Sequence, residues 1–273
     1  MPALHSISPE KLARLIGLSG APLVVDLRAA PATAIPGSVF RNPTEPLAWA
    51  PTLTSPAVLV GADGGSAAAV AAALRSEGRA AEILEGGFAA WSAEGLPTVS
   101  LVHLPRRHDD GRTWWVTRAR PKVDRIACPW LIRRFVDPEA RFLYVAPADV
   151  LTTAQQLGAE PFDVSDKSVF WSHRGERCTF DVMIEAFGLA DHAPLAYLAA
   201  IVRGADTDRL DIAPEAAGLL AISLGLSRNH SDDHEQLDAG MAVYDALYRW
   251  CRDARDEKHN WISHQPSRGK VQA

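Results

Sequence analysis

The residues best suited to chemistry lie in the second half of the chain, where His173 and Cys178 flank a glycine-containing turn. An imidazole and a thiolate favour a transition metal over magnesium or calcium. Asp206 and Asp208 follow a long apolar stretch, and their carboxylates could complete such a site. We therefore predict a metal site for zinc, iron or manganese, formed by His173, Cys178, Asp206 and Asp208. The alternative is a structural turn with a half-buried cysteine, and aspartates that cap a turn or pair with arginines.

Arginines are a second kind of candidate, because a guanidinium binds a tetrahedral oxyanion through paired donors. We predict oxyanion-binding roles for Arg125, Arg133 and Arg177. Arg125 lies near Cys128, and Pro129 suits the first position of a helix, where a thiol would have a lowered pKa. The apolar residues that follow favour the other interpretation, in which Cys128 is a small core residue.

A glycine-rich turn, GADGGS at 61–66, separates an apolar run from an alanine-rich helical pattern. The N–H groups of a helix N-terminus can hold an anion in such a turn. No cysteine occurs in residues 1–127, and covalent catalysis needs a nucleophile. We therefore expect a turn without catalytic function. Anion binding by bare backbone amides is the alternative.

Two different arrangements of elements must position these residues. Apolar runs at 22–28, 57–62 and 80–87 alternate with helical patterns, which predicts a parallel sheet covered by helices on both faces. The later part has a few strands and helical stretches at 128–136, 194–203, 213–224 and 232–254, which predicts an α+β, mainly helical domain. The predicted divisions are a first domain at 1–103, a linker at 104–112, a second domain at 113–254 and a polar tail at 255–273.

Composition excludes several classes of protein. The sequence is 47% hydrophobic and 22% charged, with no apolar run long enough to span a membrane. Its net charge of −5 is not accompanied by a basic block, which argues against nucleic-acid binding. Three widely spaced cysteines and an N-terminus without signal-peptide character fit a reducing cytoplasm.

Residues 5–98 resemble a single rhodanese domain. The matching segments are an Asp-x-Arg at Asp26 and Arg28, IPGS at 35–38 and GGFAAW at 86–91. In that family, a loop of the form C-x-x-G-x-R-S carries sulfur as a persulfide on its cysteine. Gly61 stands at the position of the cysteine here, and Ser66 at that of the arginine. The resemblance therefore implies a rhodanese-like docking domain without sulfurtransferase activity.

Residues 113–254 resemble the C-terminal domain of ChrB-type chromate resistance proteins. Three segments carry the match, DRIACPWLIRRFVDPEARFLYV, HRGERCTFDVMIEAFGL and EAAGLLAISLGLSRN, in the order of that family. The family accompanies a chromate efflux transporter. The resemblance implies a chromate-resistance accessory or sensor protein that binds a metal ion or chromate, with a functional link to such a transporter.

Other functions stay open. One is a metal-dependent enzyme, either a reductase or a hydrolase, and another is a sulfurtransferase-related protein. A third is a chromate-responsive transcriptional regulator, but a rhodanese-like module replaces the family's usual DNA-binding region and the chain is acidic.

The long amphipathic final helix would suit a homodimer.

Overall fold

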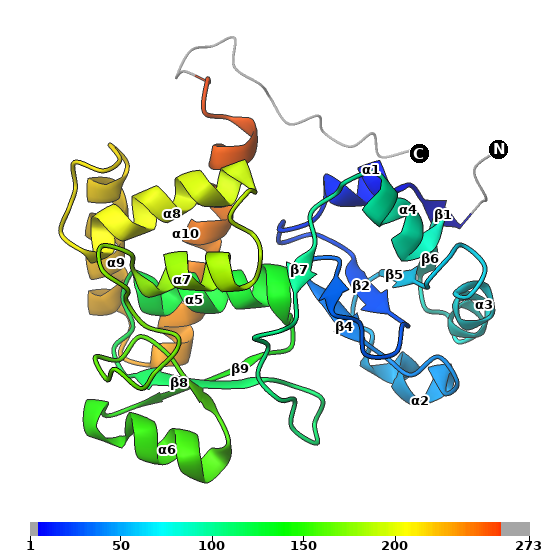
Figure 1. Cartoon of the computed structure of the whole chain (residues 1–273), viewed down its shortest axis with the longest axis horizontal. Coiled ribbons are helices and arrows are strands. Elements are labelled where there is room, and N and C mark those ends of the chain that lie inside the picture. The colour runs from blue at the N-terminus through cyan, green and yellow to red at the C-terminus, as the bar shows by residue number, and fades with distance from the viewer. Residues whose placement is uncertain (1–4, 258–273) are drawn as a thin grey trace.

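The N-terminal part is centred on a parallel sheet. The computed structural model describes residues 5–257, and Figure 1 shows this sheet beside a mainly helical C-terminal part. The strand order is β1-β6-β5-β2-β4. The strands are β1 (Ser6–Ile7), β2 (Leu23–Asp26), β4 (Ser38–Phe40), β5 (Ala57–Val60) and β6 (Ala81–Leu84). A small antiparallel pair, β3 (Thr33–Ala34) and β7 (Val99–Ser100), lies beside it.

Helices cover both faces of this sheet, as predicted. Val24 and Val58 belong to the core shared with α1 (Pro9–Ala13) and α4 (Gly87–Ala93). Val25 and Leu59, the next residues along the same strands, belong to the core beneath α2 (Pro46–Trp49), a short 3-10 turn (Ala50–Thr52) and α3 (Ala68–Ser76). Successive side chains of a strand point to opposite faces, so apolar runs buried on both sides produce this two-faced packing.

The C-terminal part has a small parallel sheet of order β10-β8-β9, with helices packed against it and against each other. Its strands are β8 (Trp114–Arg118), β9 (Arg141–Val145) and β10 (Glu160–Pro161). Its helices are α5 (Asp124–Leu131), α6 (Val150–Leu157), α7 (Thr179–Ala186), α8 (Ala193–Asp206), α9 (Ala216–Asn229) and α10 (Asp233–Asp253). A π-helical turn (Ile132–Val136) extends α5, and a 3-10 turn (Pro147–Asp149) precedes α6. The prediction of a mainly helical second domain is confirmed.

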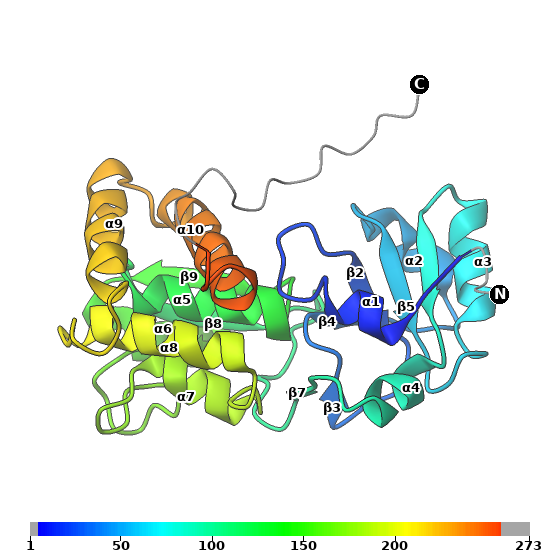
Figure 2. The same cartoon turned by 90° about the horizontal axis from the view of Figure 1, so that it is seen from above.

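Helix α5 is central to this part, because it packs against α7, α8 and α10 (Figure 2). We expected it to begin at Cys128 with Pro129 in its first turn. It begins at Asp124 instead, and Pro129 lies inside the helix. Because proline has no backbone N–H, Pro129 removes one hydrogen bond of the helix. The apolar side chains around it are fully buried. Tertiary packing therefore outweighs the local signal of the proline.

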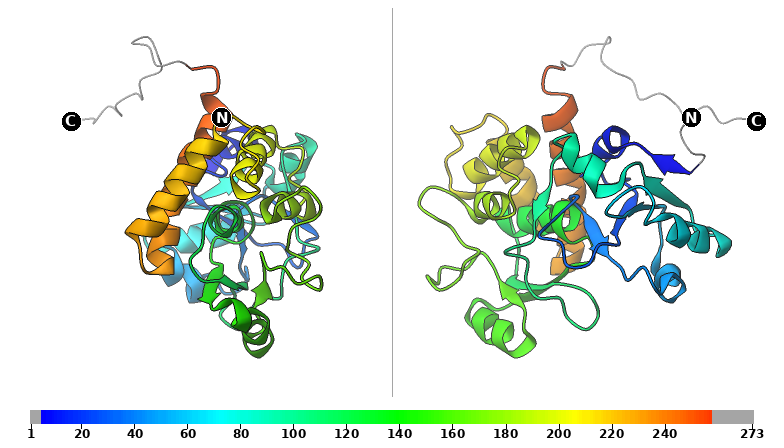
Figure 3. Two further views of the ribbon diagram at one scale, coloured as in Figure 1. Left: turned by 90° about the vertical axis from the view of Figure 1, so that its left-hand side faces the viewer. Right: turned by 45° about the vertical axis from the view of Figure 1, so that its right-hand side comes forward.

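The two parts share a continuous apolar core. Figure 3 shows α10 running beside the N-terminal part, and Arg252 near its end donates to the carbonyl of Arg14 at 3.1 Å. The Gly37 amide donates to the carbonyl of Phe135 at 2.7 Å. Gly17 has a φ of +79°, and a Cβ there would lie 2.5 Å from the Phe135 ring. Close backbone approach at these glycines joins the two parts tightly.

Candidate metal centre

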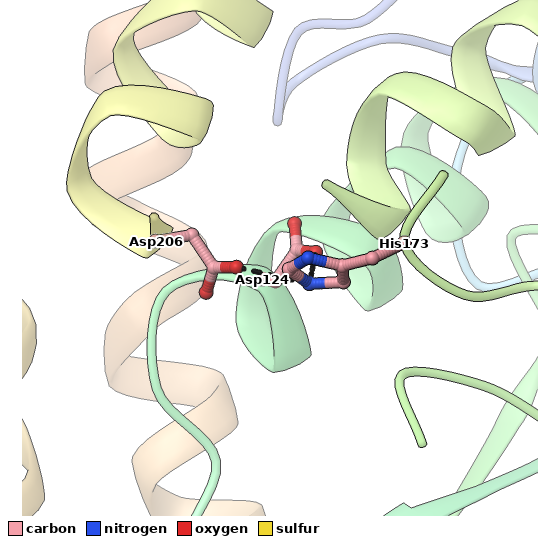
Figure 4. A group of neighbouring side chains, drawn as sticks. All are labelled: Asp124, His173 and Asp206. Atoms are coloured by element: carbon pink, nitrogen blue, oxygen red, sulfur yellow. Dashed lines mark ion pairs between the residues drawn. The ribbon is translucent and has the colours of Figure 1, made fainter. Parts of the chain in front are cut away.

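Three side chains from distant segments meet near the N-terminus of α5. Asp124 is the first residue of α5, His173 lies in the turn before α7, and Asp206 ends α8 (Figure 4). One potential ligand atom from each lies within 4.8 Å of the others. His173 Nε2 lies 3.2 Å from the Asp206 carboxylate and 3.6 Å from that of Asp124. The structure thus joins two predicted site residues to one that was not predicted.

The spacing of these atoms suits a metal ion. Two donors that each lie ~2.1 Å from one ion are separated by ~3.0 Å at a right angle and ~3.4 Å in a tetrahedron. The two separations from His173 Nε2, 3.2 and 3.6 Å, are close to that range. An imidazole with carboxylates is a donor set for zinc, manganese or iron. Small adjustments of these side chains would therefore bring all three donor atoms within bonding distance of one ion.

Asp124 is held in place by the helix that follows His173. Its carboxylate accepts hydrogen bonds from the Thr179 amide at 2.6 Å and the Phe180 amide at 3.1 Å, at the N-terminus of α7. Its side chain is fully buried. Burial, followed by the charges of Asp206 and Asp163, raises the pKa of Asp124 well above its usual value. The α7 amides favour the anion, but the neighbouring carboxylates disfavour it.

Asp163 borders the group, with its carboxylate 3.4 Å from Nε2 of His173. Arg118 and Arg125 pair with this carboxylate at 3.0 and 3.2 Å. Burial opposes ionisation of Asp163, but the hydrogen bond from His173 and the two arginine charges outweigh it and lower its pKa. Asp163 also has a φ of +51°, a rare conformation for a non-glycine residue. Its backbone amide donates to the Trp171 carbonyl at 2.9 Å, and its carboxylate accepts from the Thr179 hydroxyl at 3.2 Å.

His173 carries the counter-charge of the cluster when no cation is bound. Hydrogen bonds to Asp163 and Asp206 raise its pKa to about 10, against the opposing effect of burial. Its side chain is 40% exposed, so the group is reached from solvent. A divalent cation at Nε2 would replace the proton and neutralise the same carboxylates.

The other two predicted ligands lie outside the group of three. Cys178 is the N-cap of α7, and its Sγ lies 3.3 Å from the Asp181 carboxylate. Burial, followed by the charge of Asp124, raises the pKa of the Cys178 thiol. Asp208 is exposed and has a φ of +57°, in the turn that follows α8. The one candidate group found among residues 5–257 therefore offers a metal two carboxylate oxygens and an imidazole nitrogen, and no thiolate.

The arginines that we predicted as oxyanion ligands do not converge. Arg125 borders the candidate group through Asp163. Arg133 pairs with Asp238 at 3.6 Å and lies over the ring of Phe142. Arg177 pairs with an exposed glutamate on α7.

Cys128 lies inside α5 rather than at its N-terminus. It is fully buried, and burial, followed by the charge of Asp124, raises the pKa of its thiol well above the usual value. An activated thiol would need the opposite shift. The core interpretation of Cys128 is the one that its surroundings favour.

The glycine-rich turn of the first domain is filled by its own side chains. A Cβ at Gly61 would lie 1.8 Å from the Ser66 Oγ atom. The Asp63 carboxylate accepts hydrogen bonds from the amides of Gly65 and Ser66 at 3.0 and 3.1 Å. These amides are therefore satisfied within the turn, which argues against the alternative that they hold an external anion.

The Asp-x-Arg motif is structural. Arg28 forms an ion pair with the fully buried Asp26 at 2.6 Å and donates to the carbonyl of Thr33. Its guanidinium lies 3.5 Å from the centre of the Phe88 ring. These contacts, together with the five-stranded parallel sheet, agree with the rhodanese resemblance of residues 5–98.

Solved structures similar to this chain include two of named rhodanese type. A rhodanese-related protein from Thermoplasma volcanium is 26% identical to this chain. The match covers 35% of this chain and 97% of that protein, with a TM-score of 0.32. A thiosulfate sulfurtransferase from Pseudomonas aeruginosa is 31% identical to this chain. That match covers 36% of this chain and 19% of the sulfurtransferase, also with a TM-score of 0.32.

The second half has a family match and a curated relative. Protein ChrB of Cupriavidus metallidurans is 34% identical over 157 residues, which is 56% of this chain and 46% of that protein. The match thus spans less than half of the length of that relative. The family model described as "ChrB, C-terminal domain" matches residues 115–251, half of the chain. The chain therefore belongs to the ChrB C-terminal domain family, the chromate-resistance family that its sequence motifs resemble.

Proposed function

We propose that this chain is a chromate-resistance accessory or sensor protein whose second domain binds a divalent transition metal between Asp124, His173 and Asp206. One observation carries the proposal: His173 Nε2 faces the two carboxylates at 3.2 and 3.6 Å, with ligand atoms of all three residues within 4.8 Å of one another. Manganese, iron and zinc fit these donors. Without a thiolate among them, a preference for soft metals is not expected.

A cation fits this group better than chromate does. Chromate is a dianion, and the atoms that face His173 Nε2 are carboxylate oxygens of Asp124, Asp163 and Asp206. These oxygens can bind a cation, but they are acceptors and offer chromate no hydrogen-bond donor. Of the two ligands expected from the sequence, the metal ion is therefore the one that we assign to this position.

The first domain is proposed to act as a non-catalytic docking module. Gly61 supplies no nucleophile, and Ser66 and Asp63 fill the turn. Its tight contact with the second domain, through Gly37 and Phe135 for example, supports a structural role.

Elemental analysis of purified protein tests the metal site. Wild-type protein loaded with Mn²⁺ and then desalted should retain about one ion per chain. Asp206→Asn should lose the ion, and Asp208→Asn is the matched control because Asp208 is exposed and two positions away. Equal metal content in both variants, or none in the wild type after loading, would contradict the proposal.

A metal-dependent enzyme is a second candidate. A hollow of about 770 Å³ reaches His173 and Asp163, so a bound ion would face solvent. Three protein ligands would leave coordination positions for water or a substrate, as in catalytic zinc sites. Hydrolysis of a chromogenic ester by metal-loaded protein, lost in His173→Asn, would support this function. Equal rates in both proteins would contradict it.

A further inference from the structure

A second hollow, of about 720 Å³, is lined in part by residues 174–177 of the turn that also carries His173. Its basic lining comes from the turn, from α8 and from the loop after α8, and Glu176 is its one acidic lining residue. The chain as a whole has a net charge of −5, so the concentration of guanidinium groups here is unusual. The arginines that line this hollow are Arg174, Arg177, Arg203 and Arg209.

This hollow adjoins the candidate metal centre. Thr207 lines it and directly follows Asp206. Arg174 lines both this hollow and the one that reaches His173. A ligand held by these arginines would therefore lie beside the metal centre rather than within it.

Two of the arginines have donors to offer an incoming anion. Arg174 donates to the carbonyl of Phe170 and lies over its ring, and no carboxylate of the described residues forms an ion pair with it. Arg203 is fixed by the Asp181 carboxylate, which is only 9% exposed, at 2.7 Å from Nη1. A guanidinium has five N–H donors, and the described contacts of Arg203 use Nη1 alone. Arg203 is thus a pre-oriented donor.

The other two arginines form weak ion pairs at the rim. Arg177 and its partner Glu185 are 55% and 57% exposed. Arg209 lies 3.4 Å from Asp211, and these side chains are 52% and 73% exposed. Exposed ion pairs of this kind contribute little to stability because solvent screens them. A dianion can therefore draw both guanidiniums away from their partners at little cost.

We propose that these four arginines form a binding site for a tetrahedral oxyanion, either free or as the phosphate group of a larger molecule. The planar fork of a guanidinium matches two oxygens of such a group, and several forks can hold one group from different sides. The hollow is larger than a bare oxyanion, so both sources fit it. This inference deepens the proposed function by naming the ligand class next to the metal, but it does not require the metal to bind.

Calorimetric titration of full-length, metal-free protein at constant ionic strength tests the site. The probes are inorganic phosphate and phenyl phosphate. Wild-type protein should bind at least one of them, and the double variant Arg174→Gln, Arg209→Gln should weaken binding at least tenfold. Both side chains are exposed, so the variant should fold, which circular dichroism checks. Arg228→Gln is the control, because Arg228 is exposed on α9 and outside the hollow.

The outcomes separate the two ligand sources and the two proposals. Equal affinity for both probes assigns the site to a free oxyanion, and tighter binding of phenyl phosphate assigns it to a phosphate ester. Binding of neither probe, or equal affinity in the double variant and the wild type, overturns the inference. His173→Asn should lose the metal and keep the anion, so the two sites can fail independently.

Discussion

Raising the pH from 7 to 9 should tighten metal binding by at most about a hundredfold. The pKa of His173 is raised to about 10 by its hydrogen bonds to Asp163 and Asp206, so in metal-free protein Nε2 is protonated at pH 7. A metal that binds Nε2 must displace this proton. Each pH unit below the pKa then costs ~1.4 kcal/mol, or a tenfold loss of affinity.

Two features limit how much the metal affinity changes with pH. The His173 side chain is 40% exposed, so solvent screening reduces the shift and lowers the upper end of the pH range, but the slope of tenfold per unit within that range is unaffected. The pKa of Asp124 is also raised, by burial first. Any proton on Asp124 would leave as well, so at least one proton should be released per ion.

Calorimetry in two buffers of different ionisation heat counts these protons directly. His5→Asn is the control, because His5 is exposed in the N-terminal part, and it should keep the full pH dependence. An affinity for Mn²⁺ that is the same at pH 7 and pH 9, with no proton release, would refute the assignment of His173 as a ligand.

Three further predictions follow from the same contacts. Because the pKa of His173 is raised to about 10, protonated His173 stabilises the metal-free fold fully below about pH 6.5, and this stabilisation is lost as the pH rises towards 10. In the presence of a chelator, the melting temperature should therefore fall as the pH rises, and excess Mn²⁺ should restore it. A melting temperature that rises over this pH range would contradict the prediction. Asp124→Ala leaves two buried amides of α7 unpaired, at ~1–3 kcal/mol each. In urea, the free energy of unfolding of Asp124→Ala should therefore be ~2–6 kcal/mol lower than that of the wild type, and that of Asp208→Asn less than ~0.5 kcal/mol lower. Equal losses in the two variants would show that the Asp124 carboxylate is not needed to cap α7. Gly61→Cys should give no thiosulfate:cyanide sulfurtransferase activity, because its Cβ would lie 3.1 Å from the Asp63 carbonyl oxygen and from the Ser66 Cβ, and Ser66 stands where the family has an arginine; turnover by this variant would show that the turn can still hold a reactive thiol.

The first domain was largely predictable because its signals are local. Apolar runs such as the one containing Val24 and Val25 indicate strands buried on both faces, and the structure confirms the parallel sheet. Ser8 caps α1 through the Lys11 amide, as its position before Pro9 indicates. Such features depend on residues within a few positions of one another, so a sequence pattern can identify them.

The candidate metal centre was only partly predictable. His173 and Asp206 were identified by residue type, but Asp124 was not, because its carboxylate caps α7, a helix that begins 55 residues later. Cys178 has a suitable ligand chemistry, yet its thiol contacts Asp181. The sequence indicates which side chains could bind a metal, but tertiary packing decides which of them face one another.

Anomalous diffraction at the manganese absorption edge, from crystals grown with Mn²⁺, would locate the ion that we propose between Asp124, His173 and Asp206. We expect one strong peak ~2.0–2.3 Å from His173 Nε2 and from carboxylate oxygens of Asp124 and Asp206. Loss of this peak in Asp206→Asn, and its presence in Asp208→Asn, would complete the assignment. Well-ordered crystals with no peak at this position, or with the ion bound elsewhere on the chain, would show that these three residues do not form the metal site.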